Sequence, residues 1–143
     1  MKTYRATEKD FDRKTYLVDA SGKTLGRLAT RIAEVLIGKG KAVFAYDQLS
    51  GDQVVVINAA QVHVTGRKAG SKVYTHYTGF PGGLRSIVYE DLKVKKPEEI
   101  IRLAVARMIP NNKLGREMMR RLRIYAGDKH GQQAQKPVPL NLS

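Results

Sequence analysis

Apolar residues recur at helical spacing in the first third of the chain. Between residues 25 and 37 they fall on one side of a helix, and polar or charged residues fall on the other. The apolar positions are Leu25, Leu28, Ala29, Ile32 and Leu36. The pattern predicts an amphipathic helix over residues 25–37 with a partly basic outer face. Gly38 ends it, because glycine readily adopts the left-handed conformation of a helix C-cap.

Runs rich in β-forming residues flank this helix. Residues 15–19 fit a first strand. Residues 54–57 form a continuous β-branched run, which is typical of a strand covered on both faces. We expect a shorter strand over residues 62–65. Side-chain types alternate along residues 72–78, which fits a strand of an antiparallel pair. Residues 84–89 are predicted to be extended or to form a short strand.

Two further helices are expected in the second half of the chain. Pro97, followed by two acids, marks a first turn, because proline suits the first helical position and acids face the positive end of the helix dipole. This helix is predicted to run to residue 108. Its buried positions are Ile101, Ala104, Val105 and Met108. The last helix has an apolar face that recurs every four residues. That face consists of Leu114, Met118 and Leu122.

Strands that alternate with helices indicate a layered α/β fold. A chain of 143 residues corresponds to about one domain. We expect a single α/β domain over residues 15–125, preceded by a polar N-terminal arm over residues 1–14. Residues 126–143 are rich in Gln, Gly and Pro, which predicts an extended C-terminal tail.

The charge balance indicates an anionic partner. The chain carries 26 Lys and Arg against 13 Asp and Glu, a formal charge of +13. Nucleic acid and acidic membrane surfaces both attract such a protein. The sequence lacks the apolar span of about 20 residues that a membrane helix needs, and no secretory signal is recognisable. The absence of cysteine excludes disulfides and thiolate zinc sites. We therefore expect a cytoplasmic protein without a membrane partner.

The most basic stretch is residues 107–125. It holds six Lys and Arg around the apolar face of the last predicted helix, and Glu117 is its only acid. Solubilising surfaces usually mix both signs of charge. A guanidinium can bond two phosphate oxygens at once. The stretch therefore predicts polyanion binding, with Arg120 and Arg121 projecting away from the apolar face.

Residues 66–85 mix cations with flat rings. The cations are Arg67, Lys68, Lys72 and Arg85, and the rings are Tyr74, His76, Tyr77 and Phe80. Cations favour phosphates, and flat rings can stack on unpaired bases. Alternatively, Tyr74 and Phe80 are core residues of a long loop, because aromatic side chains are usually buried. Gly79, Gly82 and Gly83 would let a ribose-phosphate chain approach the backbone closely.

Motifs for nucleotide and metal sites are incomplete. Residues 22–24 end like a phosphate-binding P-loop, but that motif needs a glycine where Leu17 stands. His63, His76 and His130 lack the spacing that places two imidazoles on one helix face for a metal. We therefore expect no metal and no cofactor.

Asp19 and Asp52 are the carboxylates best placed for catalysis. Both flank strands, where carboxylates of α/β enzymes often hold metals. Both also stand next to Ser and Gly, as turn residues that bond their own backbone do. No catalytic triad can be assembled, so we expect no enzyme activity.

A DNA-binding architectural protein would share the basic charge. Such proteins usually present a helix-turn-helix, a β-ribbon or paired symmetry, and none is recognisable in this sequence. Preference for one defined RNA over duplex DNA at equal salt would separate the two alternatives.

Blocks of the sequence match a known family in order. They read DASGKTLGRLA at residues 19–29, GDQVVVINA at 51–59, TGFPGG at 78–83, LGR at 114–116, and YAG at 125–127 with AQKP at 134–137. They closely resemble the ribosomal protein L13 family of the bacterial large subunit. This resemblance implies a three-layer α/β/α sandwich on a mostly parallel four-stranded sheet, with basic loops and an extended C-terminal tail.

The resemblance also carries functional expectations. It implies binding to large-subunit ribosomal RNA early in subunit assembly and contact with neighbouring ribosomal proteins. It implies no catalysis, no cofactor and no small-molecule substrate.

The residues expected to contact RNA are the cations and rings described above, with one histidine of the tail. They are Lys23, Arg27, Lys39, Lys41, Arg67, Lys68, Lys72, Tyr74, His76, Tyr77, Arg85, Lys113, Arg116, Arg120, Arg121, Arg123 and His130. Capping of the preceding helix alone could explain Lys39 and Lys41, because they lie near its negative end.

Overall fold

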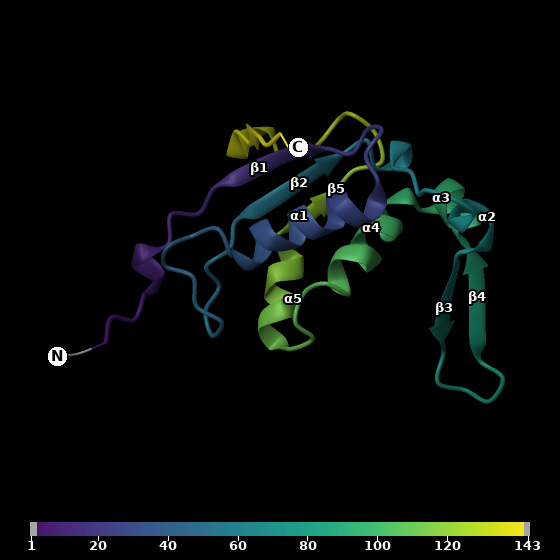
Figure 1. Cartoon of the computed structure of the whole chain (residues 1–143), viewed down its shortest axis with the longest axis horizontal. Helices are drawn as coiled ribbons and strands as arrows, with labels where there is room; N and C mark the ends of the chain where they lie inside the picture. The colour runs from purple at the N-terminus through teal and green to yellow at the C-terminus, as the bar shows by residue number, and fades with distance from the viewer. Residues whose placement is uncertain (1–2, 142–143) are drawn as a thin grey trace.

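A four-stranded sheet lies at the centre of the molecule (Figure 1). The computed structural model describes residues 3–141. The strands are β1 (Thr15–Asp19), β2 (Gln53–Ile57), β5 (Leu122–Ile124) and β6 (Val138–Pro139), in the spatial order β5-β2-β1-β6. Each neighbouring pair in this sheet is parallel. The expected α/β class with a mostly parallel four-stranded sheet is confirmed.

Three helices pack on one face of the sheet. They are α1 (Leu25–Ile37), α4 (Pro97–Ala106) and α5 (Lys113–Arg120). The connections from β1 to β2 and from β2 to β5 step in the same direction, so right-handed crossovers place their helices on the same side. Their buried side chains form the core with β2. Its most enclosed members include Ile32, Leu36, Val54, Val56, Ile100, Ile101 and Val105.

The C-terminal segment covers the other face. Val55 points to that side, because side chains alternate along a strand, and it is only 1% exposed. Gln132 and Gln135 line the same small cavity as Val55. The Thr15 hydroxyl donates to Oε1 of Gln135 at 3.5 Å. The layer on this face is therefore formed by the segment containing the 3-10 turn η3 (Gln133–Gln135), after which β6 joins the sheet edge beside β1.

A β-hairpin extends away from the main sheet (Figure 1). Its antiparallel strands are β3 (Val73–Tyr77) and β4 (Leu84–Val88). The shorter helical elements of the described chain are η1 (Glu8–Asp10), η2 (Ala59–Gln61), α2 (Lys68–Ser71) and α3 (Tyr89–Lys95). Helix α2 precedes the hairpin, and α3 follows it and packs on α4, so the hairpin is anchored at its base only.

The predicted helix over residues 25–37 and the predicted strand over residues 15–19 are confirmed with the same bounds. Gly38 has the expected left-handed conformation, with φ of 84°, and its N–H donates to the Glu34 carbonyl oxygen at 2.9 Å.

The last predicted helix is wrong at its C-terminal end. Helix α5 ends at Arg120, and Leu122 begins β5. Leu122 and Ile124 are buried and Arg123 between them is exposed, which is the period of a strand. Leu122 shares one core with Met118, so the two keep a helix-like spacing although only Met118 is helical.

Two other element predictions need correction. Helix α4 ends before Met108, which is 41% exposed instead of buried, while Ile100 is fully enclosed. Residues 62–65 form no strand, and one isolated bridge between Thr24 and His63 is the only ladder contact described there. The backbone of His63 bonds to the turn that enters α1 instead of to the sheet.

Candidate nucleic-acid interface

A basic groove lies between the first turn of α1, helix α2 and the C-terminal end of α4. Its volume is about 520 Å³. Four cations from three segments line it: Arg27 of α1, Lys68 and Lys72 at the two ends of α2, and Arg107 after α4. Within residues 3–141, none of the four forms an ion pair with an acid. Their charges therefore remain available to an anion. We call this feature the basic groove.

Tyr74 lies beside the cations of the basic groove but is itself buried. Its side chain is 7% exposed, and the Lys72 ammonium lies 5.4 Å from the ring centroid. Burial raises the pKa of Tyr74, Tyr89 raises it further, and Arg107 opposes the shift. Tyr74 also lines the basic groove, but with 7% of its surface exposed it offers little area for stacking on a base. The alternative expectation of a core residue is correct.

The hairpin has two chemically different faces. His76 pairs with Arg85 across the strands, and both are exposed. The opposite face pairs Tyr77 with Leu84, and these side chains are 61% and 65% exposed. The predicted residues of this region thus divide between a basic face and an apolar face of one ribbon.

The hairpin tip presents Phe80, which is 73% exposed. It is therefore no core residue, and its ring is free to stack. Gly79 and Gly82 have φ values of 87° and 68°, a conformation that glycine adopts without strain. A Cβ on Gly83 would lie 2.1 Å from Thr78 Oγ1 and 2.7 Å from the Phe80 carbonyl oxygen. The tip therefore favours glycine at position 82 for its backbone conformation and needs glycine at position 83 for lack of space.

Helix α5 carries exposed cations on its outer surface. Lys113, Arg116 and Arg120 are exposed, as predicted. An Arg120 Nη1 donates to Glu117 Oε1 at 2.7 Å, but the Arg120 side chain stays 76% exposed. Arg123 is also exposed but lies on β5, where it lines a small cavity with the C-terminal segment. The four residues thus do not share one helix surface.

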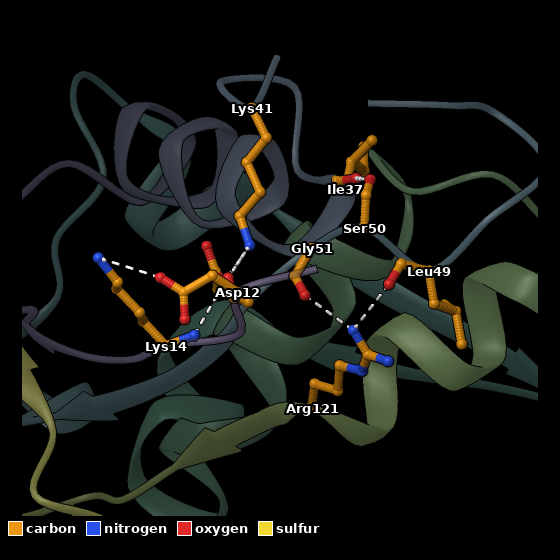
Figure 2. A network of polar contacts seen from close by, with 9 residues as sticks. Asp12, Lys14, Ile37, Lys41, Leu49, Ser50, Gly51 and Arg121 are labelled. Atoms are coloured by element: carbon orange, nitrogen blue, oxygen red, sulfur yellow. Dashed lines mark hydrogen bonds and ion pairs between the residues drawn. The ribbon is translucent and has the colours of Figure 1, made fainter. Parts of the chain in front are cut away.

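Lys41 is held inside the molecule (Figure 2). Its Nζ lies 2.6 Å from Oδ1 of Asp52 and 2.6 Å from the Asp12 carbonyl oxygen. Asp52 also accepts from the Lys14 N–H at 3.0 Å. The prediction that Asp52 is a turn residue bonding its own backbone is therefore wrong. Its carboxylate accepts hydrogen bonds from Lys14 and Lys41, which lie in two other segments. Lys41 is more than a helix cap.

Arg121 is likewise occupied (Figure 2). One Nη donates to the carbonyl oxygens of Gly51 at 2.8 Å and Leu49 at 3.5 Å. Burial lowers the pKa of the Arg121 guanidinium, Arg13 adds to this, and nearby carboxylates including Asp52 oppose it. The sequence predicts that Arg121 lies off the apolar face and contacts RNA, but its guanidinium is directed toward the loop before β2 and bonds backbone carbonyls there.

The other predicted cations are dispersed. Lys23 is half-buried and lines a second hollow of about 710 Å³ along α1. Lys39 is exposed after the C-terminal end of α1, and Arg67 is exposed before the first residue of α2. His130 is half-buried, and its Nδ1 accepts from the Gln132 N–H at 3.3 Å. His130 therefore takes part in the local structure of the tail.

Asp19 is the turn residue that the sequence predicted. Its Oδ1 accepts from the Ser21 N–H at 2.9 Å and from the Ser21 hydroxyl at 2.5 Å. The Asn58 amide donates to the same oxygen at 3.0 Å. These bonds, with the Ser21 hydroxyl first, lower the pKa of Asp19.

Residues 3–141 contain neither a cluster of metal-ligating side chains nor a helix that could span a membrane. No three His, Cys, Asp or Glu side chains there gather in a way that could hold a metal ion. None of the helices in that part of the chain is long and apolar enough to cross a bilayer.

Comparison with known proteins gives a consistent match. Residues 13–131 match the family described as Ribosomal protein L13. The chain is 51% identical over 142 residues to the large ribosomal subunit protein uL13 of Tolumonas auensis, which covers 99% of this chain and 100% of that protein. The chain belongs to the ribosomal protein L13 family.

Other members of the family agree over nearly the full length. The uL13 proteins of Aquifex aeolicus and Symbiobacterium thermophilum are 49% and 45% identical, over 99% of each chain. The resemblance noted from the sequence is confirmed. As a member of this family, the chain is a structural constituent of the large ribosomal subunit and not an enzyme.

Arg107 is a groove residue that the predicted contact set omitted. It follows the last residue of α4 and completes the basic groove. The sequence does carry a sign of this role. Arg107 stands seven residues after Ile100, so on a continuous helix it lies at the edge of the buried stripe, next to the elements that pack there. Arg107 belongs to the basic stretch over residues 107–125, for which the sequence predicts polyanion binding, although the predicted contact set does not name it.

Proposed function

We propose that the chain binds large-subunit ribosomal RNA and supports early assembly of the subunit. The observation that carries this proposal is the basic groove, where Arg27, Lys68, Lys72 and Arg107 converge without acidic partners. Like charges that converge without counterions favour a polyanion, because their mutual repulsion is relieved when phosphates bind. Membership of a large-subunit ribosomal protein family supports ribosomal RNA as that polyanion.

The exposed cations of α5 and of the hairpin extend the proposed surface. Lys113 and Arg116 lie on α5, and His76 and Arg85 lie on the basic face of the hairpin. RNA that contacts all three regions would be held in one orientation, because phosphate contacts position a nucleic acid. Neighbouring large-subunit proteins are proposed as further partners, in ribosomes of the cytoplasm.

Filter binding tests the RNA part of the proposal. Large-subunit ribosomal RNA and duplex DNA of equal length are titrated with the protein at the same salt concentration. We expect stoichiometric binding to the RNA and much weaker binding to the DNA. Equal affinity for both would favour a DNA-binding architectural protein.

Order-of-addition reconstitution tests the assembly part. Subunit components are combined with the protein present from the start, added late or left out. We expect late addition to give fewer complete subunits than early addition. Retention of the protein by isolated subunits through a high-salt gradient provides an independent check of stable incorporation.

A further inference from the structure

The basic groove combines charge with an apolar floor. Arg27, Lys68, Lys72 and Arg107 surround it, and the side chains of Leu25, Val64, Ala104 and Met108 contribute its apolar part. A site for phosphate alone needs no such floor. Ligand pockets for small organic groups typically have volumes of roughly 300 to 1,000 Å³, and the basic groove, at about 520 Å³, lies in that range.

The N-terminal turn of α1 provides a close backbone approach at the same place. Thr24 and Gly26 line the groove, and the Thr24 side chain does not cap the helix. The first N–H groups of a helix lack partners within the helix and favour anions. In α1 the Leu25 N–H already donates to the His63 carbonyl oxygen at 3.0 Å, so the N–H groups of Gly26 and Arg27 are the ones that face an anion. A Cβ built on Gly26 meets nothing within 4 Å, so the space beside Gly26 is open.

We propose that the basic groove binds one unpaired nucleotide of RNA. The cations and the first turn of α1 bind its phosphate, and Met108, 41% exposed at the groove, packs against its base. Sequence-specific proteins commonly hold RNA by bases that are splayed out of the helix. This inference rests on the proposed RNA-binding function and adds the class of ligand.

Two hairpin RNAs test the proposal on the full-length protein. They are identical except that one carries a single bulged adenosine. We expect affinity for the bulged RNA to be about tenfold higher, because the duplex offers no base to cover the apolar floor. Carbon-13 labelling of the methionine methyl groups gives a local readout. The Met108 signal should shift with the bulged RNA, while buried Met118 should not respond.

Matched variants identify the groove as the site. Arg107→Gln should reduce the preference for the bulged RNA, whereas Arg102→Gln should not, because Arg102 is paired with Glu99 on the same helix. Gly26→Ala adds a methyl group in open space, so it should preserve folding and still weaken bulged-RNA binding. Gly40→Ala, also in open space but outside the groove, is its control.

The outcomes separate this proposal from the proposed function. If the wild type binds ribosomal RNA but treats both hairpins alike, or if Met108 does not respond, the nucleotide site is refuted and RNA binding stands. If the Arg107 and Arg102 variants lose the preference equally, the site is also refuted. If the wild type binds no ribosomal RNA, both proposals fail.

Discussion

Lys41 and Asp52 form an ion pair, with 2.6 Å between Nζ and Oδ1, although one follows α1 and the other precedes β2. Their side chains are 22% and 7% exposed. Through the Asp12 carbonyl and the Lys14 N–H, the pair also holds the N-terminal arm. Lys41 is one of the cations predicted from the sequence to contact RNA. In the structure it helps to hold three segments of the protein together.

Replacing Lys41 by Met should therefore affect stability more than RNA binding. The substitution leaves the Asp52 carboxylate buried without its partner, which should cost about 3 kcal/mol in the free energy of unfolding. Urea denaturation measures this loss. Affinity for ribosomal RNA, measured well below the melting temperature, should be unchanged. Lys39→Met is the control, since Lys39 is exposed and should leave stability unaltered.

Arg120 and Arg121 are adjacent in sequence, but their replacement should affect the stability of the protein to different extents. Arg121→Ala leaves the Gly51 and Leu49 carbonyl oxygens without their donor, and we expect a loss of about 2 kcal/mol. Arg120→Ala removes an exposed pair with Glu117 and should cost less than about 1 kcal/mol. Thermal melts compare the two variants. Equal stabilities would mean that the Arg121 contacts contribute nothing to the fold.

The parts of the fold predicted well are those in which periodicity and burial agree. The stripe from Leu25 to Leu36 is continuous and ends at a glycine, so one helix explains it. The series Leu114, Met118, Leu122 fits a helix equally well by spacing. Leu122 is a strand residue because it pairs with Val54 of β2. The two residues are far apart in the sequence, so a local pattern does not reveal this pairing.

The predicted contact set includes two cations, Lys41 and Arg121, that have partners within the protein. Composition gives the sum of charges but not which of them are neutralised. The acceptors of Arg121 are backbone carbonyls, which are the same in every sequence. Conversely, Arg107 contributes to the basic groove because α4 ends next to α1 and α2, and that arrangement is tertiary.

The two glycines at the hairpin tip should respond differently to substitution. Gly83→Ala places a Cβ 2.1 Å from Thr78 Oγ1 and 2.7 Å from the Phe80 carbonyl oxygen, so the turn must rearrange. Gly82 has open space, so Gly82→Asn should be tolerated at its φ of 68°, whereas Gly82→Val should be strained. Incorporation into reconstituted subunits should fall for Gly83→Ala and Gly82→Val only. If both of these variants are incorporated as well as the wild type, the hairpin tip only connects β3 to β4 and takes no part in assembly.

Asp19 should give a defined pH dependence. Hydrogen bonds from Ser21 and Asn58 lower its folded pKa below the ordinary value of 3.8. The unfolded state therefore binds the proton more readily, so the stabilisation is complete above pH 3.8 and is lost as the pH falls through the folded pKa. Asp19→Asn should be less stable than the wild type near neutral pH, and the difference should shrink in acid. Asp128→Asn, at an exposed position, controls for the loss of one negative charge.

The salt dependence of RNA affinity tests whether phosphate contacts drive binding. Each phosphate neutralised on structured RNA should add roughly 0.7 to 0.9 to the log-log slope of affinity against potassium concentration. Arg116→Ala should lower that slope by about one unit, because Arg116 is exposed on α5 and has no acidic partner in the described chain. Arg102→Ala should leave the slope unchanged, because Arg102 Nη1 already lies 2.8 Å from Glu99 Oε1. A shallow wild-type slope, or equal changes in the two variants, would refute a phosphate-binding surface that includes α5.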